Sequence, residues 1–400
     1  MFFELALSFF IGILVGTFTG VFPGIHINLI STIILSSLTL LEKFSPESLI
    51  VFITTIAITH TFLDFIPSIY LGAPEEDNFL SVLPGHQLLR KGQAHSAVVY
   101  TLYGSLTALP IILILTFIFI KFLPSVYNAT EKIIPLILIF LSIYIIFRDK
   151  EFLISLTVFI LSGFLGFLTF NTPVKEPLLP LLSGLFGLSS LIISIKNKTQ
   201  IPKQKILPLS KIKLSKKEFL KSSLASFISA PLCSFLPGIG SGHAAVLGSE
   251  IFKQNKKEFL FSVGAINVIV LSLSFVVAFI IGKTRTGASA VVKEILNKIS
   301  QENLILILIT IFITGIITFF IAIKISKLCS NYINNINYSK LSIITILILI
   351  SLNLILTNYI GLIVLITSTS LGIFTILSNT RRINLMGCLL VPTIIYYLTL

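Results

Sequence analysis

The sequence has few charged residues. Only 11% of its 400 residues are charged, whereas soluble domains carry about a quarter. The mean hydropathy is +1.02, and apolar runs of about 20 residues, enough for a helix to cross a bilayer, recur from end to end. These runs are continuous and do not alternate as barrel strands do. The sequence therefore predicts an all-α polytopic membrane protein and excludes a soluble domain and a β-barrel.

Cysteine is also scarce. Cys233, Cys329 and Cys388 lie far apart without paired spacing, which indicates small apolar residues and neither a disulfide nor a metal site. The chain opens Met-Phe-Phe-Glu without a basic stretch or a small-residue cleavage site, so we expect a retained membrane segment and no signal peptide. No basic soluble domain accompanies the net charge of +13, which excludes nucleic-acid binding and reports membrane orientation.

One long polar stretch divides the chain almost in half. Residues 196–221 carry nine lysines and two prolines, a composition typical of a linker. We therefore predict a first membrane repeat at 1–195, a Lys-rich cytoplasmic linker at 196–218 and a second membrane repeat at 219–400.

The two halves share an order of elements. Each begins with an apolar segment broken at a Pro-Gly pair, 5–41 at 22-FPG-24 and 219–253 at 236-LPGIGSG-242. Five apolar segments follow in each half, and they match in order: 48–71 with 259–282, 97–122 with 303–327, 133–147 with 341–356, 152–168 with 358–378, and 178–195 with 385–400. This order and the shared break, rather than sequence identity, indicate an internal repeat.

Charge placement decides between a parallel and an inverted repeat. With the linker in the cytoplasm, the basic residues concentrate on the cytoplasmic side only if the second broken segment is a hairpin. We assign the first broken segment as a hairpin by analogy with the second, and this assignment places the N-terminus outside. A hairpin plus about five crossings in each half gives opposite orientations, and inverted repeats with broken helices are typical of secondary transporters. The alternative is that Pro and Gly merely kink ordinary membrane helices.

The two breaks are the predicted substrate site. Proline removes a backbone donor and glycine permits a sharp turn, so a new helix begins with free N–H groups that attract anions. The substrate-binding candidates are Pro23, Gly24, His26 and Asn28 at the first break, and Pro237, Gly238, Gly240, Ser241, Gly242 and His243 at the second. The alternative is that these residues satisfy freed carbonyl groups and bind nothing.

An ionisable pair lies inside the segment 48–71. Asp64 is the one acidic residue within an apolar segment, and His60 lies one helical turn earlier on the same face. Such a pair is costly in a membrane and is usually functional, so we predict a coupling site for a proton or Na⁺. Asn267 is the candidate in the matching segment, which carries no acid. The alternative is that Asp64 caps a helix or snorkels near the cytoplasmic end.

The chain resembles the large membrane permease subunit of the tripartite tricarboxylate transporters, the TctA family, and especially its shorter prokaryotic branch. The stretches that carry the resemblance are 20-GVFPGIHIN-28, 71-LGAPEEDNFLSVLPGHQLLRKGQAHSAV-98, 171-NTPVKEPLLPLLSGLFGLSSL-191, 234-SFLPGIGSGHAAV-246, 282-GKTRTGASA-290 and 381-RRINLMGCLLVPTI-394. Two polar loops contribute the motif residues Gly72, Glu75, Glu76, Asp77, Lys283 and Arg285. The chain departs from the family in its shorter length and in having His26 and Asn28 where many members carry small or hydroxyl residues.

The resemblance implies a permease in the plasma membrane of a prokaryote. It implies a carboxylate such as citrate as substrate, an ion gradient as driving force, and a small membrane subunit and an extracytoplasmic binding protein as partners. We therefore expect a secondary transporter for an organic anion, coupled to Na⁺ or H⁺, with an elevator or rocking movement and without a cofactor.

Two other functions remain open. A polyprenyl-phosphate translocase would need a lateral opening beside the break tips. An intramembrane enzyme would use His60 and Asp64, but no Gly-x-Ser-x-Gly elbow or zinc motif accompanies them.

Overall fold

The computed structural model describes residues 2–22, 30–31, 34, 43–72, 82–130, 133–149, 151–196, 202–235, 240–333 and 338–399. Within these residues all regular structure is helical, and nine helical segments are long and apolar enough to cross a membrane. The prediction of an all-α, multi-pass membrane protein is confirmed. The division at the linker stays a prediction.

The elements of the first half are α1 (Phe2–Val21), α4 (Pro46–Leu63), α5 (Phe65–Leu71), α6 (Val82–Leu89), α7 (Ala94–Thr130), α8 (Ile134–Phe147), α9 (Phe152–Phe170), α10 (Leu178–Leu182), the π-helical turn η3 (Ser183–Leu188) and α11 (Ser189–Lys196). Those of the second half are the 3₁₀ turn η4 (Leu209–Lys211), α12 (Lys216–Phe235), α13 (Ser241–Phe252), α14 (Lys256–Ile281), α15 (Gly287–Leu296), α16 (Gln301–Ile333), α17 (Tyr338–Leu377), the 3₁₀ turn η5 (Arg382–Met386) and α18 (Gly387–Thr399).

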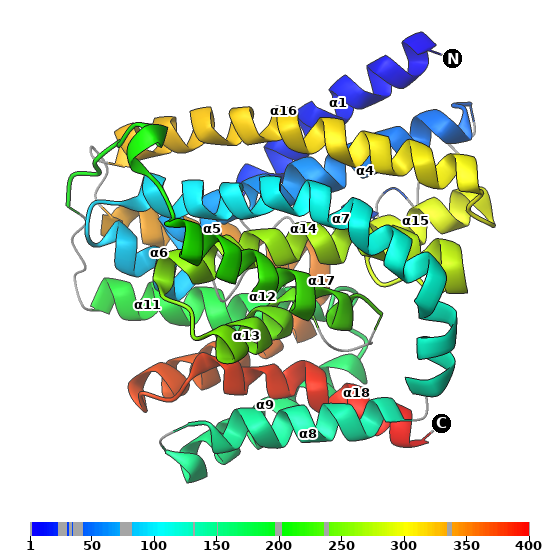
Figure 1. Cartoon of the computed structure of the whole chain (residues 1–400). Helices are drawn as coiled ribbons and strands as arrows, with labels where there is room; N and C mark the ends of the chain where they lie inside the picture. Colours follow the sequence, from blue (N-terminus) through cyan, green and yellow to red (C-terminus); the bar gives the residue numbers. More distant parts are fainter. Residues whose placement is uncertain are drawn as a thin grey trace.

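The core is built around two helices, one from each half. In the apolar stretch of α4–α5, 94% of the residues are buried, and in α14 the share is 83%, against 22% in α1. α4 packs against α1 and α16, and α14 packs against α12 and α7 (Figure 1). Each core helix therefore lies between a helix of its own half and the long helix of the other half.

The contact between α7 and α14 is a close approach of two backbones. A Cβ atom on Gly104 would lie 1.9 Å from the Phe261 carbonyl oxygen, and one on Gly264 would lie 2.1 Å from the Thr101 carbonyl oxygen. Ser105 also donates a hydrogen bond to the Gly264 carbonyl oxygen at 3.1 Å. Only glycine permits this separation, because any side chain at either position would overlap the facing carbonyl group.

Each segment with a Pro-Gly break has its two ends close together. At the start of α4, the Ser45 amide and the Ser48 hydroxyl donate to the Glu4 carboxylate of α1 at 2.9 and 2.8 Å. At the start of α14, the side-chain amide of Asn255 donates to the Glu218 carboxylate of α12 at 3.0 Å. The first turn of α12 therefore lies beside the first turn of α14, as that of α1 lies beside that of α4.

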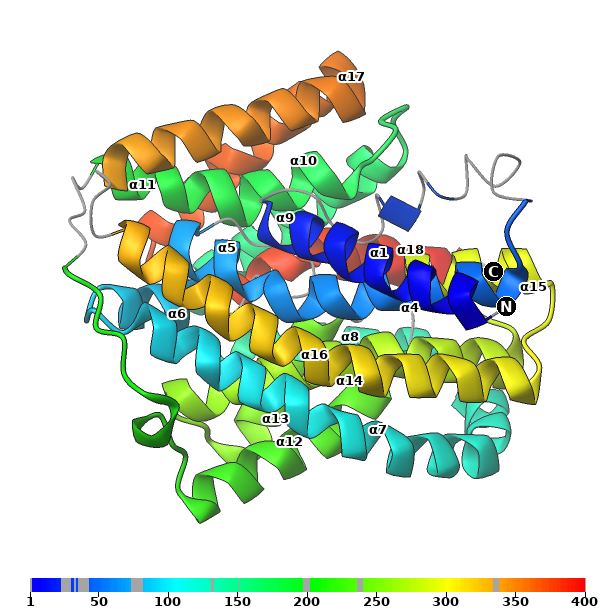
Figure 2. The ribbon, with the colours of Figure 1, turned by 90° about the horizontal axis from the view of Figure 1, so that it is seen from above.

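The helices run between two ends of the molecule. Both termini and α15 lie at one end, and α6 and α11 lie at the other (Figures 1 and 2). Residues 202–215 pack at the α6 end, where Gln204 bonds to the Ala94 amide and the Leu89 carbonyl. We call the first the terminal end and the second the linker end.

Some helix bounds differ from the apolar segments of the sequence. α7 and α16 extend past the expected 97–122 and 303–327, because hydropathy marks only the stretch suited to hydrocarbon and a helix continues beyond it. α17 contains a non-helical residue, Asn358 (φ 70°, ψ −176°), whose side-chain oxygen accepts hydrogen bonds from the amides of Ile360 and Gly361. This interruption lies between the segments expected at 341–356 and 358–378.

Candidate functional site

The described side of the second break presents a buried histidine. Gly240 precedes α13, and its amide donates to His243 Nδ1 at 3.1 Å. Because Nδ1 accepts this bond, the neutral ring carries its proton on Nε2. His243 is 1% exposed, and Nε2 has no hydrogen-bond partner among the residues that the structure describes. An N–H donor therefore stands unused at the beginning of α13, where the first amides already favour negative charge.

A cavity of about 620 Å³ lies at the terminal end, next to this break. We call it the terminal pocket. Its lining comes from seven helices and their loops: Tyr127, Phe170, Leu178, Ser234, Phe235, Gly240, Val277, Gly282, Lys283, Thr284, Arg285, Lys293, Leu389, Thr393 and Tyr397. Three of these residues are basic and none is acidic.

The basic residues of the terminal pocket are held in place by the loop after α14. Gly282 ends α14 in the left-handed conformation (φ +66°), which turns the chain toward the pocket. Lys283 donates a hydrogen bond to the Tyr127 hydroxyl and lies 4.6 Å from the centre of that ring. Lys293 donates to the Gly282 carbonyl oxygen. The loop motif Lys283 and Arg285, singled out from the sequence, thus lines the same cavity as Gly240.

His60 and Asp64 lie one turn apart, as expected. The Asp64 amide donates to the His60 carbonyl oxygen at 2.9 Å, and Asp64 separates α4 from α5. The residues are 1% and 3% exposed. Asp64 therefore does not snorkel to the surface, and its side chain forms no cap hydrogen bond to α5.

The His60 ring reaches the neighbouring helix α1. His60 Nδ1 lies 3.2 Å from Thr19 Oγ1. Since the Thr19 hydroxyl donates to the Gly16 carbonyl oxygen, the ring nitrogen is the donor in this contact. This hydrogen bond therefore links the ionisable pair to α1, the first arm of the first broken segment.

Asn267 lies in the middle of α14 and is 3% exposed. Neither its amide nitrogen nor its amide oxygen has a hydrogen-bond partner within the part of the chain that the structure describes. A buried amide without partners is unfavourable by about 1–3 kcal/mol, so a bound ligand or ion would stabilise it. No hydrogen bond joins Asn267 to His60 or Asp64, and the structure does not bring the three candidates into one bonded site.

Several predicted residues lie outside the described part of the chain: Pro23, Gly24, His26, Asn28, Glu75, Glu76, Asp77, Pro237 and Gly238. Ser241 and Gly242 are described and buried in the first turn of α13. Gly72 is described as well, and it ends α5 in the left-handed conformation (φ +69°). A Cβ atom there would lie 2.6 Å from His86 Cε1 of α6, so Gly72 has a role in the turn.

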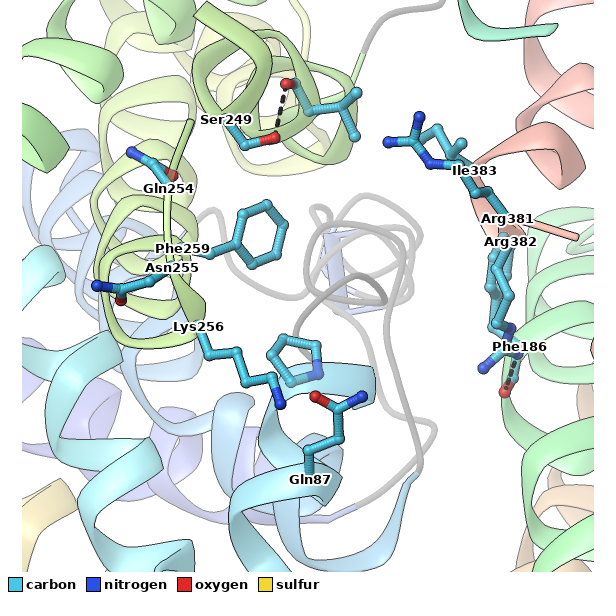
Figure 3. A pocket seen from close by; sticks show the side chains of 12 residues that line it. Gln87, Phe186, Ser249, Gln254, Asn255, Lys256, Phe259, Arg381, Arg382 and Ile383 are labelled. Atoms are coloured by element: carbon cyan, nitrogen blue, oxygen red, sulfur yellow. Dashed lines mark hydrogen bonds between the residues drawn. The ribbon is translucent and has the colours of Figure 1, made fainter. Parts of the chain in front are cut away.

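Sequence reasoning did not identify a second cavity, of about 310 Å³, at the linker end (Figure 3). We call it the linker-end pocket. Its lining is Pro84, Gln87, Phe186, Val246, Ser249, Gln254, Asn255, Lys256, Phe259, Arg381, Arg382 and Ile383. The two arginines belong to one of the motif stretches, and a charged pair between long apolar segments is a signal that could have indicated a site.

The chain matches the family described as the tripartite tricarboxylate transporter TctA family over residues 6–387. It is 31% identical over 400 residues to the uncharacterized protein MJ1079 of Methanocaldococcus jannaschii, with 97% of this chain and 98% of that protein covered. No solved structure matches it.

Proposed function

The chain belongs to the tripartite tricarboxylate transporter TctA family and is a membrane transporter component, and on that premise we propose that it is a secondary-active permease for an organic anion. The proposed substrate carries one or more carboxylate groups, as the name of the family indicates. Na⁺ or H⁺ is the proposed coupling ion. We assign the chain no enzymatic activity and no cofactor.

The observation that carries this proposal is the terminal pocket. Lys283, Arg285 and Lys293 contribute positive charge to a cavity whose described lining includes no acid. Gly240 places the beginning of α13 at the same cavity, with the unused Nε2–H of His243 in its first turn. Cationic side chains with a helix N-terminus suit the charge and the acceptor oxygens of a carboxylate.

The proposed architecture is a pair of inverted repeats, each made of a broken hairpin and about five crossings. The bonds from Glu4 to Ser45 and from Glu218 to Asn255 support it, because each hairpin must return to the face where it began. The reciprocal packing of α7 on α14 and of α16 on α4 is also what a two-fold relation between the halves requires.

Coupling is assigned to the first half. Asp64 and His60 are buried and adjacent, and a buried carboxylate favours a bound cation or a proton. In the proposed cycle, cation binding at Asp64 would make the movement of the loaded anion site favourable. Asn267 is the proposed contribution of α14 to this coupling.

A second candidate function is translocation of a lipid-linked phosphate. An apolar cavity of about 470 Å³ lies between α8 and the hairpin formed by α12 and α13. Phe235 lines both this cavity and the terminal pocket, so a hydrocarbon chain could lie beside an anionic group. This geometry fits the lateral opening that a lipid substrate requires.

The proposed setting is the plasma membrane of a prokaryote with the Lys-rich linker in the cytoplasm. The terminal pocket would then face the outside, where an extracytoplasmic binding protein could deliver the anion. A small membrane subunit is the other proposed partner, since the family is described as tripartite.

Transport by the purified protein in liposomes tests the proposal. Radiolabelled citrate, succinate, phosphate and a polyprenyl phosphate are offered under an imposed Na⁺ or proton gradient. We expect gradient-dependent uptake of a carboxylate, reduced about tenfold or more by Arg285→Gln, because one cation of the pocket is lost. Lys298→Gln is the matched control, since Lys298 lies near the same end but does not line the pocket.

Transfer of the polyprenyl phosphate without any carboxylate uptake would favour the second candidate. If the protein neither bound nor transported any of these anions, both candidate functions would be contradicted.

A further inference from the structure

We infer that the linker-end pocket is a second anion site, in which the transported organic anion is held on the linker side of the membrane. This inference rests on the proposed function and adds to it a site that the sequence did not indicate. It starts from an imbalance of charge. Lys256, Arg381 and Arg382 line the pocket, and none of its described lining residues is acidic.

Of these three cations, Arg381 already has an anionic partner. Its guanidinium forms an ion pair with Glu250 of α13 at 3.0 Å, and Glu250 also pairs with Arg148 at 2.7 Å. Although burial raises the pKa of Glu250, its hydrogen bonds from Arg148 and Arg381 hold that pKa below the usual value. Glu250 is therefore ionised at neutral pH and bound to the two arginines.

Arg382 has no such counter-ion among the described residues. Its guanidinium donates to four neutral oxygens, namely the carbonyls of Leu185 and Phe186 and the hydroxyls of Ser189 and Ser190, at 2.6–3.2 Å. Its Nε is buried without a partner. No carboxylate in the described part of the chain pairs with it. A buried charge is normally neutralised by a partner, and an anion in the pocket would supply one.

The position of Arg382 is fixed before any ligand arrives. The π-helical turn η3 places the Leu185 and Phe186 carbonyls where Arg382 can bond to both, and the Phe186 ring lies 5.1 Å from the guanidinium carbon. π-helical turns occur frequently at functional sites. A cation held this firmly loses little conformational entropy when an anion binds.

The opposite wall supplies polar groups that can reach an anion. Figure 3 shows Lys256 and Gln87 on one side of the cavity and the two arginines on the other. Lys256 is exposed and forms no ion pair in the described structure. A cavity of about 310 Å³ is at the lower end of the range for small-molecule sites, so it suits a small anion.

The same two helices connect the two pockets. Gly240, before α13, lines the terminal pocket, and Ser249, near the end of α13, lines the linker-end pocket. Lys256 begins α14 and Gly282 follows its end, so the far ends of the two linings lie about 40 Å apart along α14, whereas Gly240 and Ser249 are about 14 Å apart along α13. An anion that crosses the protein would leave one basic cavity and enter the other.

A single cysteine introduced into each pocket reports anion binding in that pocket alone. Thr284→Cys reports the terminal pocket and Ser249→Cys reports the linker-end pocket, each in a chain carrying Cys233→Ala, Cys329→Ser and Cys388→Ala. The rate of maleimide labelling is measured in liposomes with increasing citrate, succinate or inorganic phosphate on both sides of the membrane. We expect the carboxylate that protects Thr284→Cys to protect Ser249→Cys as well.

Two variants of the linker-end pocket then test whether its basic residues are responsible for the protection of Ser249→Cys. Lys256→Gln should raise the concentration for half-protection of Ser249→Cys by about tenfold and leave that of Thr284→Cys unchanged. Lys257→Gln is the control, since it is the next residue along α14 and does not line the pocket. Arg382→Gln should abolish protection of Ser249→Cys, and retained protection of Thr284→Cys shows that this variant has folded.

The outcomes separate the two proposals. Protection of Thr284→Cys without any protection of Ser249→Cys would overturn the second site and leave the proposed function standing. Protection of Ser249→Cys that Lys256→Gln and Arg382→Gln do not weaken would also overturn it. Protection of neither cysteine by any of the three anions would contradict the proposed function itself.

Discussion

The two core helices, α4–α5 and α14, occupy corresponding places in the two halves but carry different chemistry. The first contains His60 and Asp64 and is divided at Asp64 into α4 and α5. The second is continuous, carries the neutral Asn267 and ends in a loop that presents Lys283 and Arg285 to the terminal pocket. The buried acid of the first helix suits a cation, and the basic loop after the second suits an anion. The proposed function therefore divides coupling and substrate binding between the two halves.

The largest expected effect concerns how the two core helices are packed. Gly264→Val places methyl groups against the Thr101 carbonyl of α7 and should destabilise the protein by about 3 kcal/mol or prevent its folding. Thr59→Val removes only the contact between the Thr59 and Thr318 hydroxyls at 3.3 Å, and about 1 kcal/mol or less is expected. Thermal unfolding in detergent measures both. Similar melting temperatures for the two variants would show that α14 does not depend on the close backbone approach.

The next effect concerns the acidic core. Asp64→Asn keeps the size of the side chain and removes its charge, so a coupling cation would lose its principal partner. Accumulation of the anion against its gradient should fall at least about tenfold, while exchange of internal for external anion continues. Both activities are measured in the same liposomes. Loss of exchange together with accumulation would indicate a structural role for Asp64.

Substitution of the neutral Asn267 tests whether this buried amide of α14 has a functional or a structural role. Asn267→Leu removes a buried amide that has no hydrogen-bond partner, so the apo protein should be equally or more stable, by up to about 1 kcal/mol. If Asn267 contributes to coupling, the concentration of cation for half-maximal uptake should rise several-fold. A destabilised protein with unchanged cation dependence would remove Asn267 from the site.

The smallest expected effect is in the ion pairs at the linker end. Hydrogen bonds to Arg148 and Arg381 lower the pKa of Glu250, so their contribution to stability is fully present above about pH 4.5 and is lost as the pH falls through the lowered value. Glu250→Gln should lower the melting temperature by about 2 °C at pH 7 and by less at pH 3. An equal difference at both pH values would contradict this assignment.

Local features could be predicted from the sequence. The apolar runs place the spans, Asp64 follows His60 by one helical turn, and the interruption at Asn358 lies where two apolar segments were separated. Each of these follows from hydropathy or helical periodicity within about 20 residues. The basic loop residues Lys283 and Arg285 were also identified from the sequence.

Contacts between distant segments could not be predicted in this way. Nothing near Arg382 in the sequence indicates that its guanidinium binds the carbonyls of a π-helical turn almost 200 residues earlier. The same holds for Gly104 and Phe261, and for Tyr127 beside Lys283. Helix packing brings these groups together, and a single sequence records no partner for a buried position.

Parallel binding measurements on Asp64→Asn and Arg285→Gln test the division of work between the halves most directly. Binding of ²²Na⁺, or of protons where the coupling ion is H⁺, is measured at saturating carboxylate, and binding of labelled carboxylate is measured at saturating cation. We expect Asp64→Asn to lose cation binding and keep anion binding, and Arg285→Gln to do the reverse. If both variants lost both ligands equally, or if neither lost either one, the assignment of coupling to the first half and substrate binding to the second would be contradicted.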